Sequence, residues 1–443
     1  MSNEQLAISN DPQTRQMKDS GVEWIGEIPA HWEILRNKNA FSCTKSIVGN
    51  ESSKTQLLSL TTKGIREKDI SDTAGKVPES YDTYQYVEVN DMVMCLFDLD
   101  CSAVFSGISS YNGMISPAYK VLKSKEKIVP KFADYWFKYV SDDRKFKQYS
   151  KSLRYTLVYE EFSALPVLLP PLSEQQTIAA YLDRKCTQID TLIANQQQQI
   201  EKLKAYKQSV ITETVTKGLD PDVAMKDSGV EWIGEIPEHC SLVPMKYLAE
   251  AIGDGIHSTP NYDINGNFFF INGNNIGEER LQFKESTNKL NAQEFANYKA
   301  PLLTDNTILI TLNGATYGRT SFYNNEPVLL GKSARYITLK PYVNKRYIRY
   351  YLQSSISKLI MDLSLAGTTI QNVSLRTLNT FTVVYPQINE QERIVTYLDR
   401  KCSQIDKLIA LKQQKIEKLQ QYKKSLIYEY VTGKREVELC CQP

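Results

Sequence analysis

The chain has few of the residues that build metal centres and disulfide frameworks. Its 443 residues include three histidines and eight cysteines, and no two cysteines form a C-x-x-C pair. Zinc sites of the usual spacings are therefore not expected. Cys186 and Cys402 occupy equivalent positions of a repeat described below, and we interpret them as buried structural thiols.

Long apolar runs and a large net charge are also missing. Without a signal-peptide pattern or an apolar run of about 18 residues, we expect a reduced, cytoplasmic protein with no membrane partner. Lysine and arginine total 53 against 51 aspartates and glutamates, which gives a formal net charge of +2. Proteins that hold DNA unaided are usually more basic, so DNA binding would require a partner or a local basic patch.

Signatures of enzymes are scarce. Gly331-Lys332-Ser333 resembles the end of a phosphate-binding loop, but Glu326 stands where the first glycine of that motif belongs. Neither G-x-S-x-G nor H-E-x-x-H occurs. We therefore predict a non-catalytic chain without a metal or cofactor of its own.

What the chain does contain is a long internal repeat. Residues 17–29, MKDSGVEWIGEIP, recur unchanged at 225–237, and residues 172–209 are echoed by 388–425. Units this long belong to one duplicated module, because solenoid repeats run about 20–50 residues. The predicted divisions are a flexible tail (1–16), a first globular domain (17–171), a helical spacer (172–217), a linker with a second domain (218–387), a second spacer (388–436) and a C-terminal tail (437–443).

The two spacers carry the signals of long helices. Ser173 and Asn389 each begin a capping pattern. Each segment then continues for about forty residues without proline or glycine and stops near Gly218 or Gly433. Either helix could be continuous or could break near its repeat cysteine.

Apolar residues recur along both helices in steps of three, four and seven, which is the pattern of a coiled-coil seam. Two equivalent helices that pack on each other through the same face are related by a two-fold axis. We therefore predict an intramolecular antiparallel coiled coil with pseudo-two-fold symmetry; the alternative is that each helix packs on its own domain. The seam positions are Ile189, Ile193, Ile200, Leu203, Val210, Ile405, Ile409, Ile416, Leu419 and Leu426.

The segments between the repeats differ from each other and indicate mixed domains, so the predicted fold class is α+β. Asn-Gly and Asp-Gly turns separate short strand candidates in the second segment. The expected strands are 84–89, 91–97, 167–169, 267–272, 307–312 and 383–385, and the expected helices are 132–140 and 345–354.

Loops of both segments carry the residue types that read base edges and bind phosphates. No single loop is specific, and each alone could be an ordinary surface loop. The candidate DNA-binding residues are Thr61, Thr62, Lys63, Arg66, Arg154 and Tyr155 in the first segment, and His257, Ser258, Thr259, Asn274, Asn275, Thr316, Tyr317, Arg319, Thr369 and Gln371 in the second.

The repeated motifs resemble a known family. SGVEWIGEIP before a histidine-containing turn, PPLSEQQTIAAYLD at 170–183 and YPQINEQERIVTYLD at 385–399 are similar to the specificity subunits of type I restriction–modification systems. The segments LTTKGI, CLFDLD and GMISPAY, and DGIHSTP with GNNIG, also resemble the target-recognition domains of that family. The resemblance covers about residues 17–436.

The resemblance implies that each divergent domain binds one half of a bipartite sequence in double-stranded DNA. It also implies that the paired helices dock two copies of a modification (methyltransferase) subunit. S-adenosylmethionine would belong to those partners, and ATP and Mg to restriction subunits that can join them. Three alternatives stay open: a methylation-only or related defence assembly, a coiled-coil adaptor that binds proteins, and an enzyme with an unrecognised site.

Overall fold

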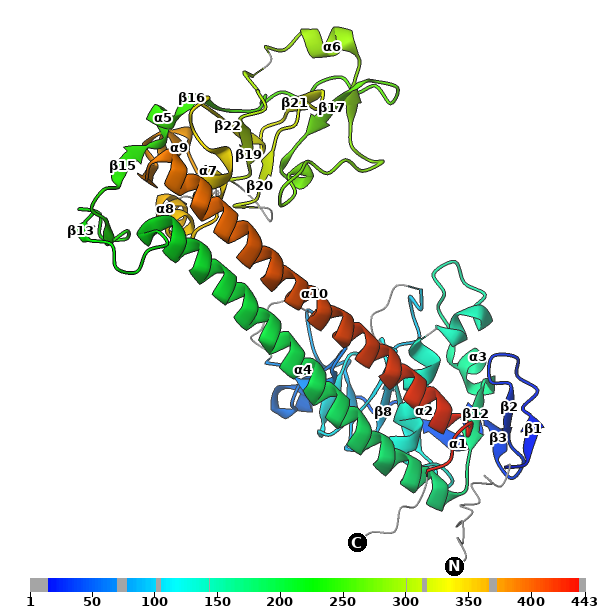
Figure 1. Ribbon diagram of the computed structural model, residues 1–443. Coiled ribbons are helices and arrows are strands. Elements are labelled where there is room, and N and C mark those ends of the chain that lie inside the picture. Colours follow the sequence, from blue (N-terminus) through cyan, green and yellow to red (C-terminus); the bar gives the residue numbers. More distant parts are fainter. Residues whose placement is uncertain are drawn as a thin grey trace, which may run out of the picture. The chain divides into compact units, whose positions relative to one another are not determined.

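The computed structural model describes residues 15–69, 78–100, 105–142, 144–299, 301–312, 317–365 and 373–437. The chain divides into two compact units. Unit 1 joins Met1–Gln196 to Gln414–Pro443, and unit 2 is Gln197–Gln413. Both divisions fall inside the long helices α4 (Leu172–Lys217) and α10 (Ile388–Val431), so each unit contains a part of both helices (Figure 1).

Unit 1 is built on a four-stranded antiparallel sheet in the order β4-β11-β8-β9, with short hairpins around it. Its elements are β1 (Met17–Asp19), β2 (Glu27–Pro29), β3 (Glu33–Arg36), α1 (Asn37–Ala40), β4 (Phe41–Cys43), η1 (Gly49–Lys54), β5 (Leu58–Thr61), β6 (Gly64–Glu67), β7 (Gln85–Val87), β8 (Met92–Met94), β9 (Ser106–Ile108), β10 (Gly113–Ile115), β11 (Lys120–Ser124), α2 (Pro130–Asp142), η2 (Lys145–Tyr149), α3 (Tyr159–Ala164) and β12 (Pro166–Leu169).

Unit 2 repeats this sheet topology in the order β16-β22-β19-β20, although its sequence there does not match that of unit 1. Its elements are β13 (Met225–Asp227), β14 (Glu235–Pro237), β15 (Ser241–Pro244), α5 (Met245–Leu248), β16 (Ala249–Asp254), β17 (Phe268–Ile271), η3 (Gly273–Asn275), β18 (Lys289–Leu290), α6 (Ala292–Ala296), β19 (Thr307–Ile310), β20 (Thr320–Phe322), β21 (Val328–Leu330), β22 (Arg335–Leu339), α7 (Lys345–Leu352), α8 (Ser355–Leu365), α9 (Leu375–Thr380) and β23 (Thr382–Tyr385).

An amphipathic helix packs on the sheet of each unit. In unit 1, Phe132, Trp136 and Phe137 of α2 are fully buried and belong to the same core as Met92 of β8. In unit 2, Tyr347 of α7 is fully buried among residues of β19 and β22. Burial of an aromatic side chain contributes about 1.5–3 kcal/mol, so these helices anchor the sheets to the cores.

Each long helix begins with the same buried side-chain contact. The amide of Gln175 donates from Nε2 to the carbonyl oxygen of Pro170 at 2.8 Å. Gln391 makes the same bond to Pro386, also at 2.8 Å. Both helices then run without interruption for 46 and 44 residues, so the break considered near the repeat cysteines does not occur.

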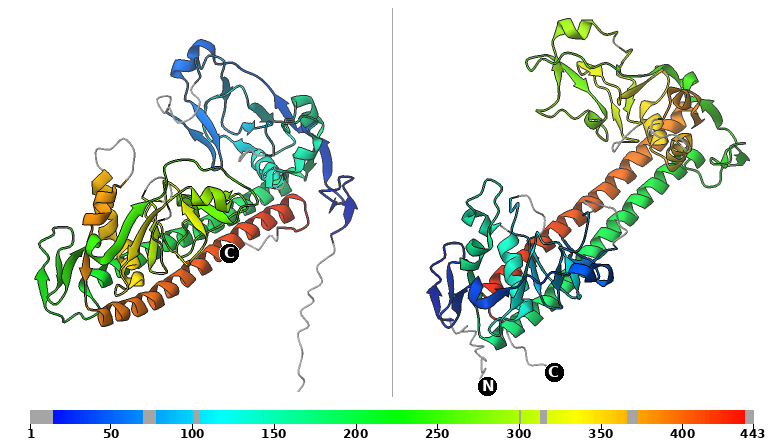
Figure 2. Two further views of the ribbon diagram at one scale, coloured as in Figure 1. Left: turned by 90° about the horizontal axis from the view of Figure 1, so that it is seen from above. Right: turned by 180° about the vertical axis from the view of Figure 1, so that it is seen from behind.

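Within each unit the two long helices run antiparallel, and the two views of Figure 2 show them side by side. In unit 1, Lys423 Nζ donates to both carboxylate oxygens of Asp190 at 2.7 Å. In unit 2, Lys207 Nζ binds Asp406 in the same way, also at 2.7 Å. The two lysines are equivalent in the repeat, and so are the two aspartates, so one contact occurs twice. The predicted α+β fold class, with long antiparallel helices, is confirmed.

The ten seam positions are all shielded from solvent. Ile189, Ile200, Val210, Ile405, Ile416 and Leu426 are buried, and Ile193, Leu203, Ile409 and Leu419 are half-buried. The helices also pack on the globular part of their own unit, since Tyr135 of α2 donates to Asp183 at 2.8 Å and Tyr350 of α7 donates to Asp399 at 2.7 Å. Both packing modes considered from the sequence are therefore present together.

Glu174, in the first turn of α4, fastens the N-terminal hairpin of unit 1 to that helix. Its carboxylate accepts from Arg15 at 2.7 Å and from the Trp32 indole N–H at 2.9 Å, and it pairs with the His31 ring at 2.5 Å. Arg15 belongs to the tail predicted at 1–16, and its side chain makes this contact with the first turn of α4. Burial opposes ionisation of Glu174, but hydrogen bonds from His31 and Trp32 and the charge of Arg15 lower its pKa.

Replacement of Glu174 by glutamine should therefore lower the stability of unit 1 in a pH-dependent way. A carboxyl group whose pKa is lower in the folded state stabilises above its unfolded pKa, here near 4.5, and that stabilisation disappears as the pH falls through the folded value. We expect a Tm decrease of roughly 2–4 °C at pH 7, the effect of about 1 kcal/mol, which shrinks below about pH 4.5. Thermal unfolding from pH 3 to 8 measures it. Glu33→Gln, at an exposed position of β3, is the control, and an equal loss at pH 3 would contradict the explanation.

Candidate nucleic-acid interface

The hairpin of β5 and β6 presents the first group of candidate residues. The Thr61 hydroxyl donates to the carbonyl oxygen of Gly64 at 2.8 Å and accepts from the backbone N–H of Lys63 at 3.1 Å. This side chain therefore closes the two-residue turn of Thr62 and Lys63. Gly64, the first residue of β6, has a φ of 91° that glycine adopts without strain. Thr62, Lys63 and Arg66 remain exposed around the turn.

The hairpin forms one wall of a groove of about 520 Å³ in unit 1. Strand β9, helix α2 and the two long helices supply the other walls, through residues that include Ser106, Lys131, Asp134, Lys138, Asp190 and Lys423. Thr61, Thr62, Lys63 and Arg66 all line it. The structure thus brings four sequence-predicted residues into one hollow with three lysines that the sequence analysis did not select.

The charges of the groove fall into two groups. Lys138 is paired with the buried Asp134 at 2.7 Å, and Lys423 is paired with Asp190. Lys63, Arg66 and Lys131 have no ion-pair partner among the residues that the structure describes. Three cations that lack an ion-pair partner in the described part of the chain, beside hydroxyl groups, are the chemistry that binds phosphates and base edges. The paired charges instead hold the elements of the groove together.

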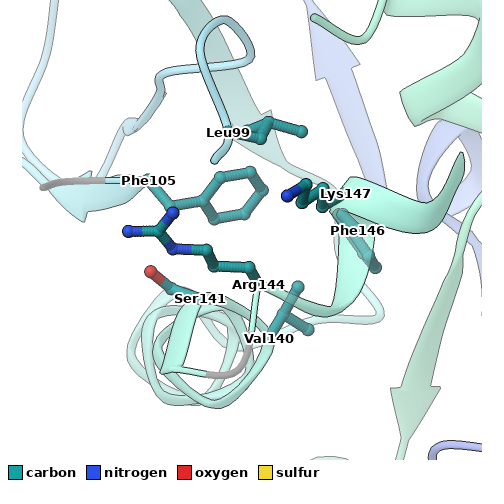
Figure 3. A pocket seen from close by; sticks show the side chains of 7 residues that line it. All are labelled: Leu99, Phe105, Val140, Ser141, Arg144, Phe146 and Lys147. Atoms are coloured by element: carbon teal, nitrogen blue, oxygen red, sulfur yellow. The ribbon is translucent and has the colours of Figure 1, made fainter. Parts of the chain in front are cut away.

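A second hollow in unit 1 is much smaller. It measures about 20 Å³ and is lined by Leu99, Phe105, Val140, Ser141, Arg144, Phe146 and Lys147. The side chains of Arg144 and Lys147 lie beside the ring of Phe105 (Figure 3). This space holds about one water molecule, whereas small-molecule sites occupy about 300–1,000 Å³. The hollow is therefore too small for a nucleotide.

The remaining candidates in unit 1 do not line the groove. Arg154 is exposed, and Tyr155 is half-buried with its ring 4.0 Å from Lys147 Nζ. The carbonyl oxygen of Tyr155 accepts from the backbone N–H of Leu99, so this residue helps to hold the local fold.

The candidates of unit 2 are dispersed and partly committed to structural contacts. His257 pairs with Asp254 at 2.9 Å and is exposed together with Ser258 and Thr259. Asn274 is exposed, but the Asn275 side chain accepts from the backbone of Asn272 at 3.0 Å and donates to the carbonyl of Gln282 at 3.0 Å. Asn275 thus holds its own turn.

Two of the last loop candidates, Tyr317 and Arg319, directly precede β20. Tyr317 is half-buried against the core of unit 2, whereas Arg319 is exposed. Thr316, Thr369 and Gln371 lie outside the described residues. Two further cations, Lys345 and Arg349 of α7, lie 5.2 and 5.3 Å from the ring of Phe322 in β20, but the Arg349 side chain is buried and pairs with Glu279 at 3.5 Å. Before the structure, only their place on the helix predicted at 345–354 could have indicated them.

The long helices also expose the same pair of apolar residues twice. In unit 1 the pair is Leu192 of α4 and Tyr422 of α10, which are 45% and 53% exposed. In unit 2 the pair is Leu408 of α10 and Tyr206 of α4, which are 48% and 52% exposed. The leucines are equivalent in the repeat and so are the tyrosines. We call each pair a Leu–Tyr patch; exposed large apolar residues that recur at equivalent positions are candidates for a contact surface.

No helix in the described part of the chain is long and apolar enough to cross a membrane. Residues 99–202 and 245–421 match the model of the type I restriction modification DNA specificity domain. The chain therefore belongs to this family of type I restriction–modification specificity proteins, as its repeated motifs indicated.

Individual relatives agree with the family. The type I restriction enzyme MjaVIII specificity subunit of Methanocaldococcus jannaschii is 24% identical over 93% of this chain and 94% of its own length. The putative type I restriction enzyme MjaX specificity subunit of the same organism is 26% identical over 71% of this chain and 70% of its own. A chain from a structural study of complex assembly and conformational transition of the type I R-M system has a TM-score of 0.65 at 15% identity, covering 92% of this chain and 99% of that one. This likeness supports the fold.

Proposed function

We propose that the chain determines the DNA sequence that a type I restriction–modification complex recognises. This sequence is asymmetric and bipartite, and each unit binds one half-site. The observation that carries this proposal is the contrast between what is duplicated and what is not. The helix contacts Asp190–Lys423 and Lys207–Asp406 are the same contact made twice. The groove loops of unit 1 have no sequence counterpart in unit 2. Two domains with different loop sequences on one repeated scaffold favour the recognition of two different half-sites.

The same scaffold favours two identical partners. Each unit offers one Leu–Tyr patch of the same composition, and an identical surface binds an identical protein. We propose that these patches contribute to docking two copies of the modification subunit. S-adenosylmethionine would then act in those subunits, and ATP and Mg in any restriction subunits that join them, while this chain takes no chemical part in the reaction.

The small net charge of the chain fits this division of roles between the chain and its partner subunits. Its formal net charge is +2, and three cations with no ion-pair partner among the described residues line the groove of unit 1. Affinity for DNA depends mainly on the number of phosphates that a protein neutralises, so a nearly neutral subunit needs partners to complete the phosphate contacts. We therefore expect specific, tight binding from the assembled complex and weak binding from the isolated chain.

Mapping N6-methyladenine across the genome with and without this chain tests the proposal. Its deletion should remove methylation at one asymmetric, interrupted sequence and leave other methylated motifs unchanged. Restoring the intact chain should restore that motif. A protein-binding adaptor would leave the methylation pattern unaltered, and that result would refute the proposal. If the genome-wide motif were palindromic, the assignment of one half-site to each unit would be wrong.

A further inference from the structure

The glutamate at the start of each long helix has different partners in the two units. In unit 1, Glu174 binds Arg15, His31 and Trp32. In unit 2 the equivalent Glu390 pairs with His239 at 2.7 Å. When the two copies of the hairpin are aligned, the flanking residue Val223 stands where unit 1 has Arg15, and Cys240 stands where it has Trp32. Unit 2 has therefore lost a cation and an N–H donor at this point and has gained a thiol.

The three side chains of unit 2 converge. The nitrogen of His239, the sulfur of Cys240 and a carboxylate oxygen of Glu390 all lie within 4.8 Å of one another. Cys240 is 2% exposed, and its thiol has no hydrogen-bond partner among the described residues. Within the part of the chain that the structure describes, no other three such groups meet in this way.

We propose that His239, Cys240 and Glu390 bind one zinc ion, with water as the fourth ligand. Zinc favours nitrogen and sulfur donors together with a carboxylate in tetrahedral geometry, whereas magnesium and calcium favour oxygen donors alone. The ion would stand in unit 2 for the positive charge that Arg15 supplies in unit 1. It would thus fasten the β13–β14 hairpin to the start of α10, as Arg15 and Glu174 fasten the first hairpin to α4.

The geometry requires only small movements. Ligand atoms bound to zinc at about 2.0–2.3 Å in a tetrahedron lie roughly 3.3–3.8 Å apart. The nitrogen–oxygen contact of His239 with Glu390 would lengthen from 2.7 Å, and both side chains are exposed enough, at 43% and 22%, to rotate. The thiol proton of Cys240 leaves to solvent as the thiolate binds the metal, so binding weakens as the pH falls.

Cobalt(II) substitution tests the site on the full chain. We use a variant with Cys440→Ser and Cys441→Ser, because these adjacent terminal cysteines could bind metal themselves. One equivalent of cobalt should produce tetrahedral visible bands and a thiolate-to-cobalt charge-transfer band, and zinc should displace both. Zinc should also raise the Tm of this protein, because a ligand that binds only the folded state stabilises it.

Two further substitutions in that background decide the interpretation. Cys240→Ser should abolish the charge-transfer band and the zinc-dependent rise in Tm, whereas Cys95→Ser, at another buried cysteine, should retain both. Cys240→Trp, which copies the first repeat, should also abolish binding, and circular dichroism verifies that each variant is folded. Absence of the band in the folded background protein, or its persistence in Cys240→Ser, would overturn the proposal.

Discussion

Replacing Lys63 and Arg66 with alanine is expected to remove recognition of one half of the DNA target and to spare the other. Both residues line the groove of unit 1, are exposed beside the β5–β6 turn and have no ion-pair partner in the described part of the chain. Loss of base or phosphate contacts at two such side chains costs about 1–3 kcal/mol, so specific binding should weaken roughly 10–100-fold. The Thr61 hydroxyl, which closes the turn, is left in place.

The measurement uses the assembled complex with the modification subunits. A library of sites randomised in one half at a time gives the specificity of each unit, and binding at several salt concentrations gives the number of ionic contacts. The slope of log K against log salt should fall by about one for each phosphate contact removed. Lys131→Ala should reduce affinity for all sequences alike, because this lysine belongs to α2 and not to the β5–β6 hairpin.

Lys54→Ala is the control for a loss of charge alone, since Lys54 is highly exposed and does not line the groove. If the Lys63 and Arg66 double variant binds and methylates the same sequences as the wild type, the groove is not the reading surface. If both half-sites lose specificity together, the variant has damaged the fold and not a contact.

The second prediction with a large effect compares a substitution in the buried seam between the long helices with a substitution on their exposed face. Ile189→Glu places a charge in the core of unit 1, where Ile189 is 5% exposed and packs in one cluster with Leu426. An unpaired buried charge costs at least about 3 kcal/mol, so unit 1 should unfold at a much lower temperature or fail to fold. Leu192→Glu lies one turn along on the same helix but is exposed, and its cost should stay within about 0.5 kcal/mol.

Leu192→Glu, which costs little stability, should nevertheless impair the binding of the modification subunits. Because Leu192 belongs to a Leu–Tyr patch, Leu192→Glu should leave a folded chain that holds one modification subunit instead of two. Leu192→Glu combined with Leu408→Glu should hold none, and native mass spectrometry counts the subunits. Retention of two subunits by the double variant would exclude the patches as docking surfaces. Wild-type stability of Ile189→Glu would exclude the seam.

The scaffold could be predicted from the sequence because its signals are local. Proline-free segments, capping residues and apolar steps of three and four fix helices such as α4 and α10, and duplication implied their pairing. The shared topology of the two four-stranded sheets could not be predicted, since the strands of the two units have no common sequence. A strand is defined by partners far along the chain, and many sequences satisfy the same pairing.

Identical sequence also proved compatible with different surroundings. Trp24 and Trp232 occupy the same place in the thirteen-residue repeat. The Trp24 indole donates to the Tyr149 hydroxyl at 2.9 Å and lies against Trp136, whereas Trp232 is 45% exposed. The difference comes from residues in the divergent segments, which lie more than a hundred positions away in unit 1. The local sequence pattern therefore determines the hairpin but not the contacts that the hairpin makes with the rest of its unit.

The candidate site was predictable only in part for a related reason. Residue type and loop position selected Lys63 and Arg66, which have no ion-pair partner among the residues that the structure describes. They also selected Asn275, whose side chain is already bonded to Asn272 and Gln282. They could not select Lys131 or Lys138, since basic residues on a helix gain their role from the hairpin that faces them. Whether a polar group already has a hydrogen-bond or ion-pair partner is decided only in the folded chain.

The division of the chain has a consequence for its synthesis. Unit 2 is one continuous segment, Gln197–Gln413, and all of its core is available once that segment has left the ribosome. Unit 1 needs Leu426, Ile427, Tyr430 and Val431, near the end of α10, to complete its core. Unit 1 is therefore synthesised first but completes its folding last. During translation the apolar face of α4 in unit 1 stays exposed until its partner, about 230 residues downstream, has been made, and chaperones and proteases have access to it in that time.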